Sequence, residues 1–141
     1  MDRKGSAVWQ GSIKEGKGTV STESGTLKTA PYSFTSRFEH GAGTNPEELL
    51  GAAHAGCFSM AFSGQLGGAK LTAEFINTTA TVTVEKLESG FAITHINLAV
   101  EAKVPGADQA TFDQCAAAAK AGCPVSKLFN TRITMDAKLV G

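Results

Sequence analysis

The sequence has no excess of charge and no long apolar segment. Its 141 residues include 13 basic and 13 acidic side chains, so the formal net charge is zero. This balance gives no electrostatic reason to expect nucleic acid or an anionic membrane surface as a partner. A membrane-spanning helix needs about 20 consecutive apolar residues, and polar residues or glycine interrupt every apolar stretch here. We therefore predict no nucleic-acid partner and no membrane insertion.

Cysteine is scarce, and its spacing excludes several site types. The three cysteines are Cys57, Cys115 and Cys123, an odd number that does not suggest the disulfide framework of a secreted protein. No Cys-x-x-Cys pair is present and the three histidines are scattered, so we expect no metal site. The charged first residues are not followed by an apolar segment, which predicts no signal peptide and a cytoplasmic protein.

Other catalytic signatures are also missing. The chain contains no nucleophilic-serine elbow, no phosphate-binding loop and no carboxylate pair suited to sugar hydrolysis. It has no internal repeats or low-complexity segments. Its length predicts a single domain, residues 1–141, that buries about two thirds of the surface of the unfolded chain.

One stretch, residues 43–62, predicts a long helix. Asn45 can cap its first turn, Pro46 suits the first helical position, and Glu47 and Glu48 complement the positive end of the helix dipole. The residues that follow are small or apolar on all sides, ending at 63–64 or continuing to 67–68. A helix without a polar face is expected to be buried.

The rest of the chain predicts strands and two shorter helices. Alternating or β-branched stretches before residue 40 indicate strands, and the strict alternation over 31–38 makes Arg37 point away from the aromatic residues of that strand. Asp108 should cap a helix over 109–121, and Gly122 should end it in the left-handed conformation. The remaining predicted elements are strands over 75–85 and 91–104, a short helix from Pro124 and a closing strand over 131–140. The order predicts an α+β fold with antiparallel sheets around a central helix.

The three thiols differ in their expected reactivity. Cys123 precedes Pro124 at a helix N-terminus, where free N–H groups favour the thiolate, so it is a candidate reactive or resolving cysteine. It can also be a small residue that simply caps a helix. Cys57 lies among apolar residues in mid-helix, where a thiol is usually inert unless a cation reaches it. Cys115 lies on the apolar stripe of its helix and is expected in the core.

His54 precedes Cys57 by three residues, which places both side chains on one face of the helix. It can act as a base toward the thiol, or it can be a polar residue at a helix or subunit contact. The sequence leaves its role open.

Three segments together carry a family resemblance. They are Asn-Pro-Glu-Glu-Leu-Leu at 45–50, Ala-His-Ala-Gly-Cys-Phe-Ser-Met-Ala at 53–61 and Gly-Cys-Pro-Val-Ser-Lys at 122–127. The chain resembles the OsmC/Ohr family of thiol peroxidases. Residues 17–24 and 31–39 are similar to the osmotically inducible OsmC branch, and the resemblance extends over essentially the whole chain.

The resemblance implies a fold, an activity and a set of site residues. The fold would be an intertwined homodimer whose central helices are wrapped by sheets. The activity would be the reduction of organic hydroperoxides, and less efficiently of hydrogen peroxide, in oxidative and osmotic stress defence. Cys57 corresponds to the peroxidatic cysteine, Cys123 to the resolving cysteine, Arg37 to the arginine that activates the thiolate and Glu47 to the carboxylate that orients it. No cofactor is implied beyond an external thiol reductant.

The chemistry of these residues agrees with that assignment. A buried Cys57 needs a cation to ionise, and the permanently charged fork of Arg37 can supply one. The apolar side chains of Phe58, Met60 and Phe62 would suit the tail of a hydroperoxide. Glu47 and Cys57 lie ten residues apart on one helix, about 15 Å along its axis. We therefore expect Glu47 of a partner subunit to hold the arginine beside Cys57, in an active site at the dimer interface.

Two other functions remain open. The chain can be a non-catalytic binder of a lipophilic stress ligand, with its cysteines in the core. A general thiol–disulfide oxidoreductase is a third possibility, although the missing Cys-x-x-Cys pair argues against it.

Overall fold

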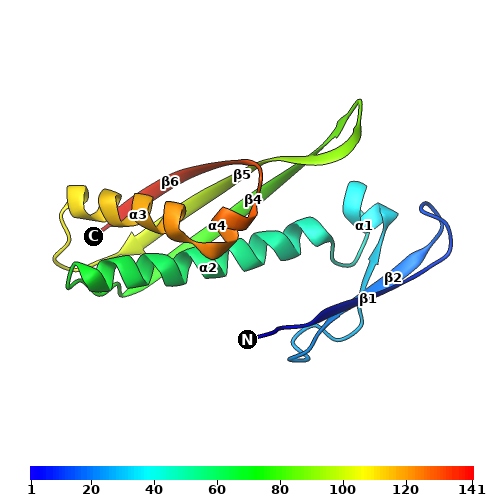
Figure 1. The fold of residues 1–141 in the computed structure, drawn as a ribbon, viewed down its shortest axis with the longest axis horizontal. Helices are drawn as coiled ribbons and strands as arrows, with labels where there is room; N and C mark the ends of the chain where they lie inside the picture. Colours follow the sequence, from blue (N-terminus) through cyan, green and yellow to red (C-terminus); the bar gives the residue numbers. More distant parts are fainter. The chain divides into compact units, whose positions relative to one another are not determined.

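The computed structural model describes residues 1–141 and contains six strands and four helices (Figure 1). Contacts divide the chain into two compact units, Met1–Leu49 and Leu50–Gly141. No helix combines the length and apolarity that a membrane crossing would need. In chain order the elements are β1 (Gly5–Gln10), β2 (Lys17–Thr22), β3 (Ala30–Ser33), α1 (Phe34–Phe38), α2 (Pro46–Gly68), β4 (Phe75–Leu87), β5 (Gly90–Lys103), α3 (Gln109–Gly122), α4 (Pro124–Leu128) and β6 (Arg132–Val140).

The first unit contains a small antiparallel sheet in the order β1-β2-β3. The Tyr32 ring lies against Gly18 of the neighbouring strand and leaves no space there for a side chain. Trp9 of β1 stacks at a tilt on the same tyrosine, with 5.3 Å between ring centroids. This unit has no fully buried apolar side chain, so the sheet is stabilised mainly by its ladder and these aromatic contacts.

The predicted strand over 31–38 is wrong in its second half. The extended chain ends at Ser33, and residues Phe34–Phe38 form the short helix α1. The Ser33 hydroxyl accepts the N–H of Ser36, and the Ser36 hydroxyl accepts the N–H of Ser33, which is a complete capping box. These local hydrogen bonds override the alternating pattern. Arg37 consequently lies over the Phe38 ring, 4.9 Å from its centroid, instead of pointing away from the aromatic residues.

The second unit is built on a three-stranded sheet in the order β4-β5-β6. The antiparallel pairing of β4 with β5 agrees with the predicted strands over 75–85 and 91–104. The expectation of wholly antiparallel sheets is wrong for β6, which pairs parallel to β5 from His95↔Arg132 to Lys103↔Val140. The reason is the connection, because α3 and α4 carry the chain back along the sheet before β6 begins.

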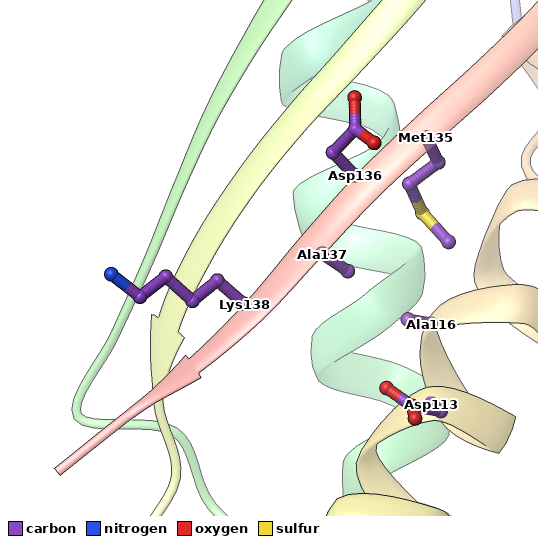
Figure 2. A pocket seen from close by; sticks show the side chains of 6 residues that line it. All are labelled: Asp113, Ala116, Met135, Asp136, Ala137 and Lys138. Carbon is purple, nitrogen blue, oxygen red and sulfur yellow. The ribbon is translucent and has the colours of Figure 1, made fainter.

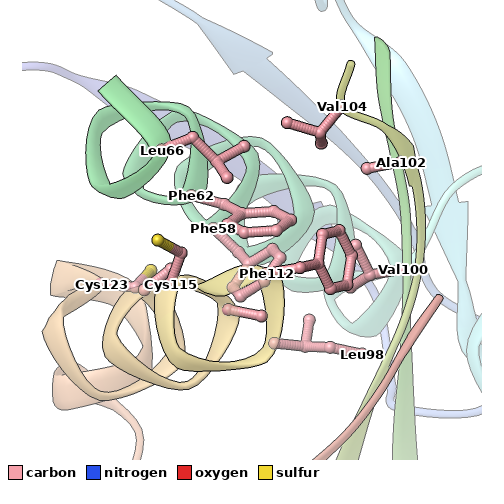
Figure 3. Packing of buried hydrophobic residues seen from close by; sticks show 12 residues of the cluster. Phe58, Phe62, Leu66, Leu98, Val100, Ala102, Val104, Phe112, Cys115 and Cys123 are labelled. Atoms are coloured by element: carbon pink, nitrogen blue, oxygen red, sulfur yellow. The ribbon is translucent and has the colours of Figure 1, made fainter. Parts of the chain in front are cut away.

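The core of this unit lies between the sheet and two helices that cover one of its faces (Figure 3). Every second residue of β5 points into it, from Ile96 to Ala102. The Phe62 ring of α2 meets the Phe112 ring of α3 edge-on, with 5.2 Å between centroids. The α2 and α3 side chains in the core are Phe58, Phe62, Leu66, Phe112, Cys115, Ala116 and Ala119.

Helix α2 begins as the sequence predicted and continues to Gly68. The Asn45 side chain accepts the N–H of Glu48, the expected cap. The expectation that α2 is buried on all sides is wrong for the single chain, because one face is exposed to solvent and the Met60 side chain is 80% exposed there. The other exposed positions on α2 from residue 52 onward are mostly small: Ala52, Ala53, Gly56, Ser63, Gly64, Gln65, Gly67 and Gly68.

Helix α3 has the predicted cap and a different end. The Asp108 carboxylate accepts the N–H of Thr111, and this bond lowers the pKa of Asp108. Gly122 is the last helical residue and is not in the left-handed conformation that was predicted for it. The chain leaves the helix through Cys123, whose φ of −57° and ψ of 123° start the turn into α4. Pro124 occupies the first position of α4, which agrees with the prediction.

Candidate functional site

Two free thiols from different helices meet in the second unit. Cys57 comes from the middle of α2 and is half-buried, whereas Cys123 precedes α4 and is 0% exposed. Cys57 packs against the core cluster that contains Cys123, and each thiol shifts the pKa of the other. The structure thus brings together the two cysteines that the sequence analysis identified, 66 positions apart in the chain.

The surroundings of the two thiols shift their pKa values in opposite directions. Burial raises the pKa of Cys57, although the N–H of Val125 partly opposes that effect, and Cys123 raises it further. Burial also acts to raise the pKa of Cys123, but the N–H and hydroxyl of Ser126, together with the Cys57 thiol, outweigh it and lower that pKa. Within this unit Cys123 is therefore the thiol that ionises first. No cation is among the groups that act on either sulfur.

Cys115 belongs to the core, as predicted. It is 8% exposed and its thiol donates weakly to the backbone carbonyl of Gln65, with 3.6 Å between sulfur and oxygen. Phe58 and Phe62 are also fully buried core residues, so the expectation that they receive a substrate tail is wrong. Of the three side chains proposed for that role, only Met60 is accessible.

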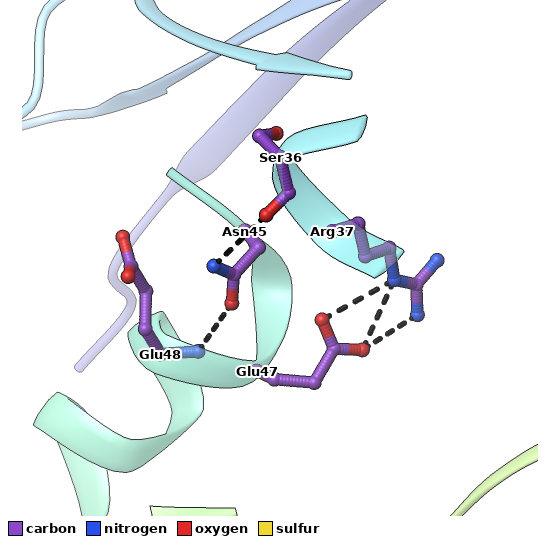
Figure 4. A network of polar contacts seen from close by, with 5 residues as sticks. All are labelled: Ser36, Arg37, Asn45, Glu47 and Glu48. Atoms are coloured by element: carbon purple, nitrogen blue, oxygen red, sulfur yellow. Dashed lines mark hydrogen bonds and ion pairs between the residues drawn. The ribbon is translucent and has the colours of Figure 1, made fainter. Parts of the chain in front are cut away.

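Arg37 and Glu47 form an ion pair in the first unit (Figure 4). Arg37 donates from Nε and Nη2 to Glu47 Oε1, at 3.0 and 2.8 Å, and Nε also lies 3.3 Å from Oε2. The Glu47 side chain is nearly buried while the Arg37 side chain is 38% exposed. This fork-shaped contact fixes the plane of the guanidinium and leaves its other edge available for a second anionic partner.

The pair is made within one chain. The sequence analysis placed Glu47 in a different subunit from the Cys57 that it serves, and the structure pairs Arg37 with Glu47 of the same chain. Glu48 is excluded from this role because it is exposed and its carboxylate accepts the Thr44 hydroxyl. The capping of α2 by Asn45, which also donates to the Ser36 carbonyl, places Glu47 beside α1.

An aromatic hollow of about 230 Å³ adjoins Arg37. Its walls come from the first unit and are mainly apolar, with Arg37 as the single charged side chain. The lining residues are Trp9, Ile13, Tyr32, Ser33, Phe34, Arg37 and Phe38. The sequence analysis missed this hollow because the predicted strand over 31–38 placed Arg37 on the opposite side from the aromatic rings.

His54 lies on the same side of α2 as Cys57 and is also fully buried. Its Nε2 lies 2.7 Å from the Ser126 hydroxyl, and its ring meets the Phe129 ring edge-on. Its Nδ1 has no hydrogen-bond partner. Burial lowers the pKa of His54, so the ring is neutral at pH 7.

Another surface hollow lies between α3 and β6 (Figure 2). It has a volume of about 470 Å³ and is bordered by Asp113, Asp136 and Lys138. It contains no thiol and no histidine. The chain also has no group of three or more histidine, cysteine or acidic side chains arranged to hold a metal ion.

Comparison with known proteins identifies the family of the chain. Residues 39–138 match the family of OsmC-like proteins. The chain belongs to the OsmC-like family. It is 58% identical over 139 residues to the peroxiredoxin OsmC of Escherichia coli. The aligned region covers 99% of this chain and 97% of that protein. The chain is accordingly an enzyme of the peroxidase type.

Solved structures share the OsmC-like fold. An OsmC-like protein of unknown function from Vibrio cholerae superimposes with a TM-score of 0.77 at 14% identity, covering 98% of this chain and 99% of that one. The organic hydroperoxide resistance protein OhrB of Bacillus subtilis has a TM-score of 0.70 at 22% identity, covering 96% and 98%. At these identities the likeness concerns the fold alone.

Sequence reasoning did not single out Ser126, which contacts His54 and lowers the pKa of Cys123. Its signal was present, since Ser126 is the third residue after Cys123 and so returns to the same side of the first turn of α4. What the sequence did not reveal is the contact with His54, because 72 residues separate them. The four predicted site residues assemble as two pairs, Cys57 with Cys123 and Arg37 with Glu47.

Proposed function

We propose that this OsmC-like protein reduces organic hydroperoxides, and hydrogen peroxide less efficiently, through Cys57 and Cys123. The observation that carries the proposal is the direct contact of two free thiols next to the N–H groups of Val125 and Ser126. A structural cysteine pair needs no such donors, whereas a thiolate does. The peroxiredoxin name of the E. coli relative supports the same reaction.

The proposed reaction has two chemical steps. The Cys57 thiolate attacks the terminal oxygen of the hydroperoxide, the O–O bond breaks, and Cys57 becomes a sulfenic acid while the alkoxide leaves. Cys123 then attacks the Cys57 sulfur, so that a disulfide forms and hydroxide leaves. The alkoxide and hydroxide take up the two protons that the thiols released, giving alcohol and water. An external thiol reductant returns the disulfide to two thiols, as the reducing conditions of the cytoplasm would allow.

The first step needs a cation at Cys57, because burial raises the pKa of that thiol. Arg37 is the cation we assign, with Glu47 holding its guanidinium in place. The aromatic hollow beside Arg37 would receive the apolar part of the hydroperoxide. This hollow replaces Phe58 and Phe62 as the proposed substrate contact.

We assign the Arg37–Glu47 pair of one subunit to Cys57 of a second subunit in a homodimer. Glu47 and Cys57 are separated by ten residues of one continuous helix, about 15 Å along its axis. The exposed face of α2, with small residues and Met60, has the composition of a helix that packs closely against another. The dimer would therefore complete two equal sites across a two-fold axis.

Mixed dimers test this assignment. The Cys57→Ser and Arg37→Ala variants should each be inactive, but refolding them together should restore about a quarter of the wild-type activity if subunits mix at random in a two-fold dimer. One site of each mixed dimer then has an intact Cys57 and an intact Arg37. Absence of recovery in a dimer that has demonstrably exchanged subunits would place both residues in the same subunit.

The peroxidase reaction itself is tested by turnover of cumene hydroperoxide with a dithiol reductant. Cys57→Ser should abolish turnover, and the matched variant Cys115→Ser should keep it, since Cys115 is a core residue. Mass spectrometry after one equivalent of hydroperoxide should detect a Cys57–Cys123 disulfide in the wild type. Full activity of Cys57→Ser would refute the peroxidatic role of Cys57, whereas absence of turnover in the wild type would favour a non-catalytic binder of a lipophilic ligand.

A further inference from the structure

His54 is a buried titratable group that the proposed reaction does not use. It is 0% exposed and sits one helical turn before Cys57 on α2. Its only hydrogen-bond partner is the Ser126 hydroxyl, 2.7 Å from Nε2. Burying an imidazole removes its hydrogen bonds to water, and this costs free energy unless a hydrogen bond within the protein compensates for the loss. The contact between His54 and Ser126 therefore calls for a functional account.

Ser126 connects this histidine to the resolving thiol. It is the third residue of α4, and Cys123 is the residue that caps the same helix, so the first turn brings them together. The turn is closed by the Lys127 N–H, which donates to the Cys123 carbonyl at 3.0 Å. From this position both the N–H and the hydroxyl of Ser126 act on the Cys123 sulfur and favour its ionised form.

The hydrogen-bond pattern determines which ring nitrogen carries the proton. A neutral imidazole has one donor and one acceptor nitrogen, and a hydroxyl has a single proton to donate. If the ring proton were on Nδ1, the Ser126 hydroxyl would donate to Nε2 and would have no proton left for Cys123. A proton on Nε2, donated to the Ser126 oxygen at 2.7 Å, instead leaves the Ser126 hydroxyl proton free for the Cys123 sulfur, and this is the tautomer that we assign. The unpartnered Nδ1 is then a lone pair and not a stranded N–H.

We propose that Ser126 and His54 are positioning residues that hold Cys123 as the thiolate nucleophile of the resolving step. The donors form a chain from His54 Nε2–H to the Ser126 oxygen, and from the Ser126 hydroxyl to the Cys123 sulfur. The inference rests on the proposed function, because it concerns the second of its two steps. It assigns neither residue a role in the attack of Cys57 on the hydroperoxide.

In that step the thiolate of Cys123 attacks the sulfenic sulfur of Cys57. The S–S bond forms as the S–O bond breaks, and the hydroxide that leaves takes a proton from solvent to become water. Ser126 and His54 keep their own protons throughout. They act by orienting the Cys123 sulfur and by keeping it ionised. A hydrogen bond to an ionised group is stronger than one between neutral groups, and removing its donor removes that stabilisation.

Single-turnover kinetics separate this role from a merely structural one. Reduced protein is mixed with one equivalent of cumene hydroperoxide, the Cys57 sulfenic acid is trapped with dimedone at successive times, and the disulfide is quantified by mass spectrometry. Ser126→Ala should leave sulfenic acid formation within about twofold of the wild type and slow disulfide formation roughly tenfold or more, as expected for a lost hydrogen bond to a charged group. The sulfenic acid should accumulate visibly.

Conservative variants provide the matched controls. Ser126→Thr keeps the hydroxyl and should restore fast disulfide formation. His54→Gln keeps an N–H donor near the position of Nε2 and should stay close to the wild type, whereas His54→Leu removes the donor and should behave like Ser126→Ala. The pH dependence of Cys123 alkylation by iodoacetamide, measured in a Cys57→Ser background, should move to higher pH in Ser126→Ala.

The outcomes distinguish the two hypotheses. Equal disulfide rates in the wild type and Ser126→Ala, or equal slowing by Ser126→Thr and Ser126→Ala, would overturn the positioning role while leaving the peroxidase reaction intact. If the wild type forms no sulfenic acid, the proposed function fails. In that event the pH dependence of Cys123 alkylation alone tests the positioning role. The same pH dependence with and without Ser126→Ala would refute the link between Ser126 and Cys123.

Discussion

The two units of the chain differ in what they bury. Every buried apolar side chain lies in Leu50–Gly141, together with all three thiols. In Met1–Leu49 the buried side chains are polar ones, Ser36 and Glu47, and the unit holds its aromatic residues in partly exposed positions. One unit is a packed core that carries nucleophiles, and the other is a small sheet and helix that carry an oriented cation.

This difference indicates a division of labour. The packed unit can fix two sulfurs in contact because its helices are anchored by aromatic core residues. It lacks a cation beside them, and the protonated state of Cys57 reflects that lack. The other unit has a guanidinium held by a carboxylate and a capping box. Under the proposed function, ionisation of Cys57 needs a cation from outside this core.

The largest effect on stability should come from the core of the second unit. Phe62→Ala should lower the free energy of unfolding by about 3–5 kcal/mol, because it removes a fully buried ring and leaves a cavity. The matched change Phe34→Ala in the first unit should cost clearly less, since that ring is partly exposed. Urea unfolding followed by circular dichroism measures both, and equal costs would contradict the contrast between the units.

The second prediction tests the difference between the two units by removing the cation, Arg37, from the first unit. Arg37→Ala should slow reduction of hydroperoxide about 100-fold, because a neighbouring guanidinium typically shifts the pKa of an anionic group by 1–3 units. The pH at which Cys57 is alkylated should rise, since burial alone raises the pKa of Cys57. Arg37→Lys keeps the charge without the fork and should fall in between. If the pH dependence of Cys57 alkylation is the same in Arg37→Ala and in the wild type, Arg37 does not act on the Cys57 thiol.

A smaller effect is expected at the cap that orients Arg37. Ser33→Ala removes the acceptor of the Ser36 N–H, and a lost cap costs about 1 kcal/mol. Hydrogen exchange of the α1 amides should speed up about fivefold, which corresponds to that free energy. Ser6→Ala, at an exposed position in β1, is the control and should leave the α1 amides unchanged.

The smallest effect concerns the buried His54 and the loss of stability at low pH. Because burial lowers the pKa of His54, the folded protein resists protonation while the unfolded chain binds a proton near pH 6.5. The unfolded state then holds more protons, so stability falls as the pH drops below that value, by about 0.7 kcal/mol between pH 7 and pH 6. His54→Gln should flatten this dependence in urea unfolding. An equal slope in the variant would mean that His54 titrates normally in the fold.

Much of the fold followed from local patterns. The cap at Asn45, the cap at Asp108 and the first position of Pro124 all depend on neighbouring residues, and each was predicted correctly. The strand over 31–38 was predicted wrongly because the same residues satisfy two local rules, and the hydrogen bonds of Ser33 with Ser36 outweighed the alternation. The parallel pairing of β6 depends on a crossover of two helices, which no local pattern specifies.

The candidate site divides in the same way. The sequence by itself determined the family and singled out Cys57, Cys123, Arg37 and Glu47 as candidate site residues, because these residue types and their motifs suit thiol chemistry. Only the tertiary structure decided that Arg37 binds Glu47 of its own chain. It alone placed His54 against Ser126 and showed that burial raises the pKa of Cys57. These outcomes depend on burial and on contacts between distant segments, since both set the local cost of a charge.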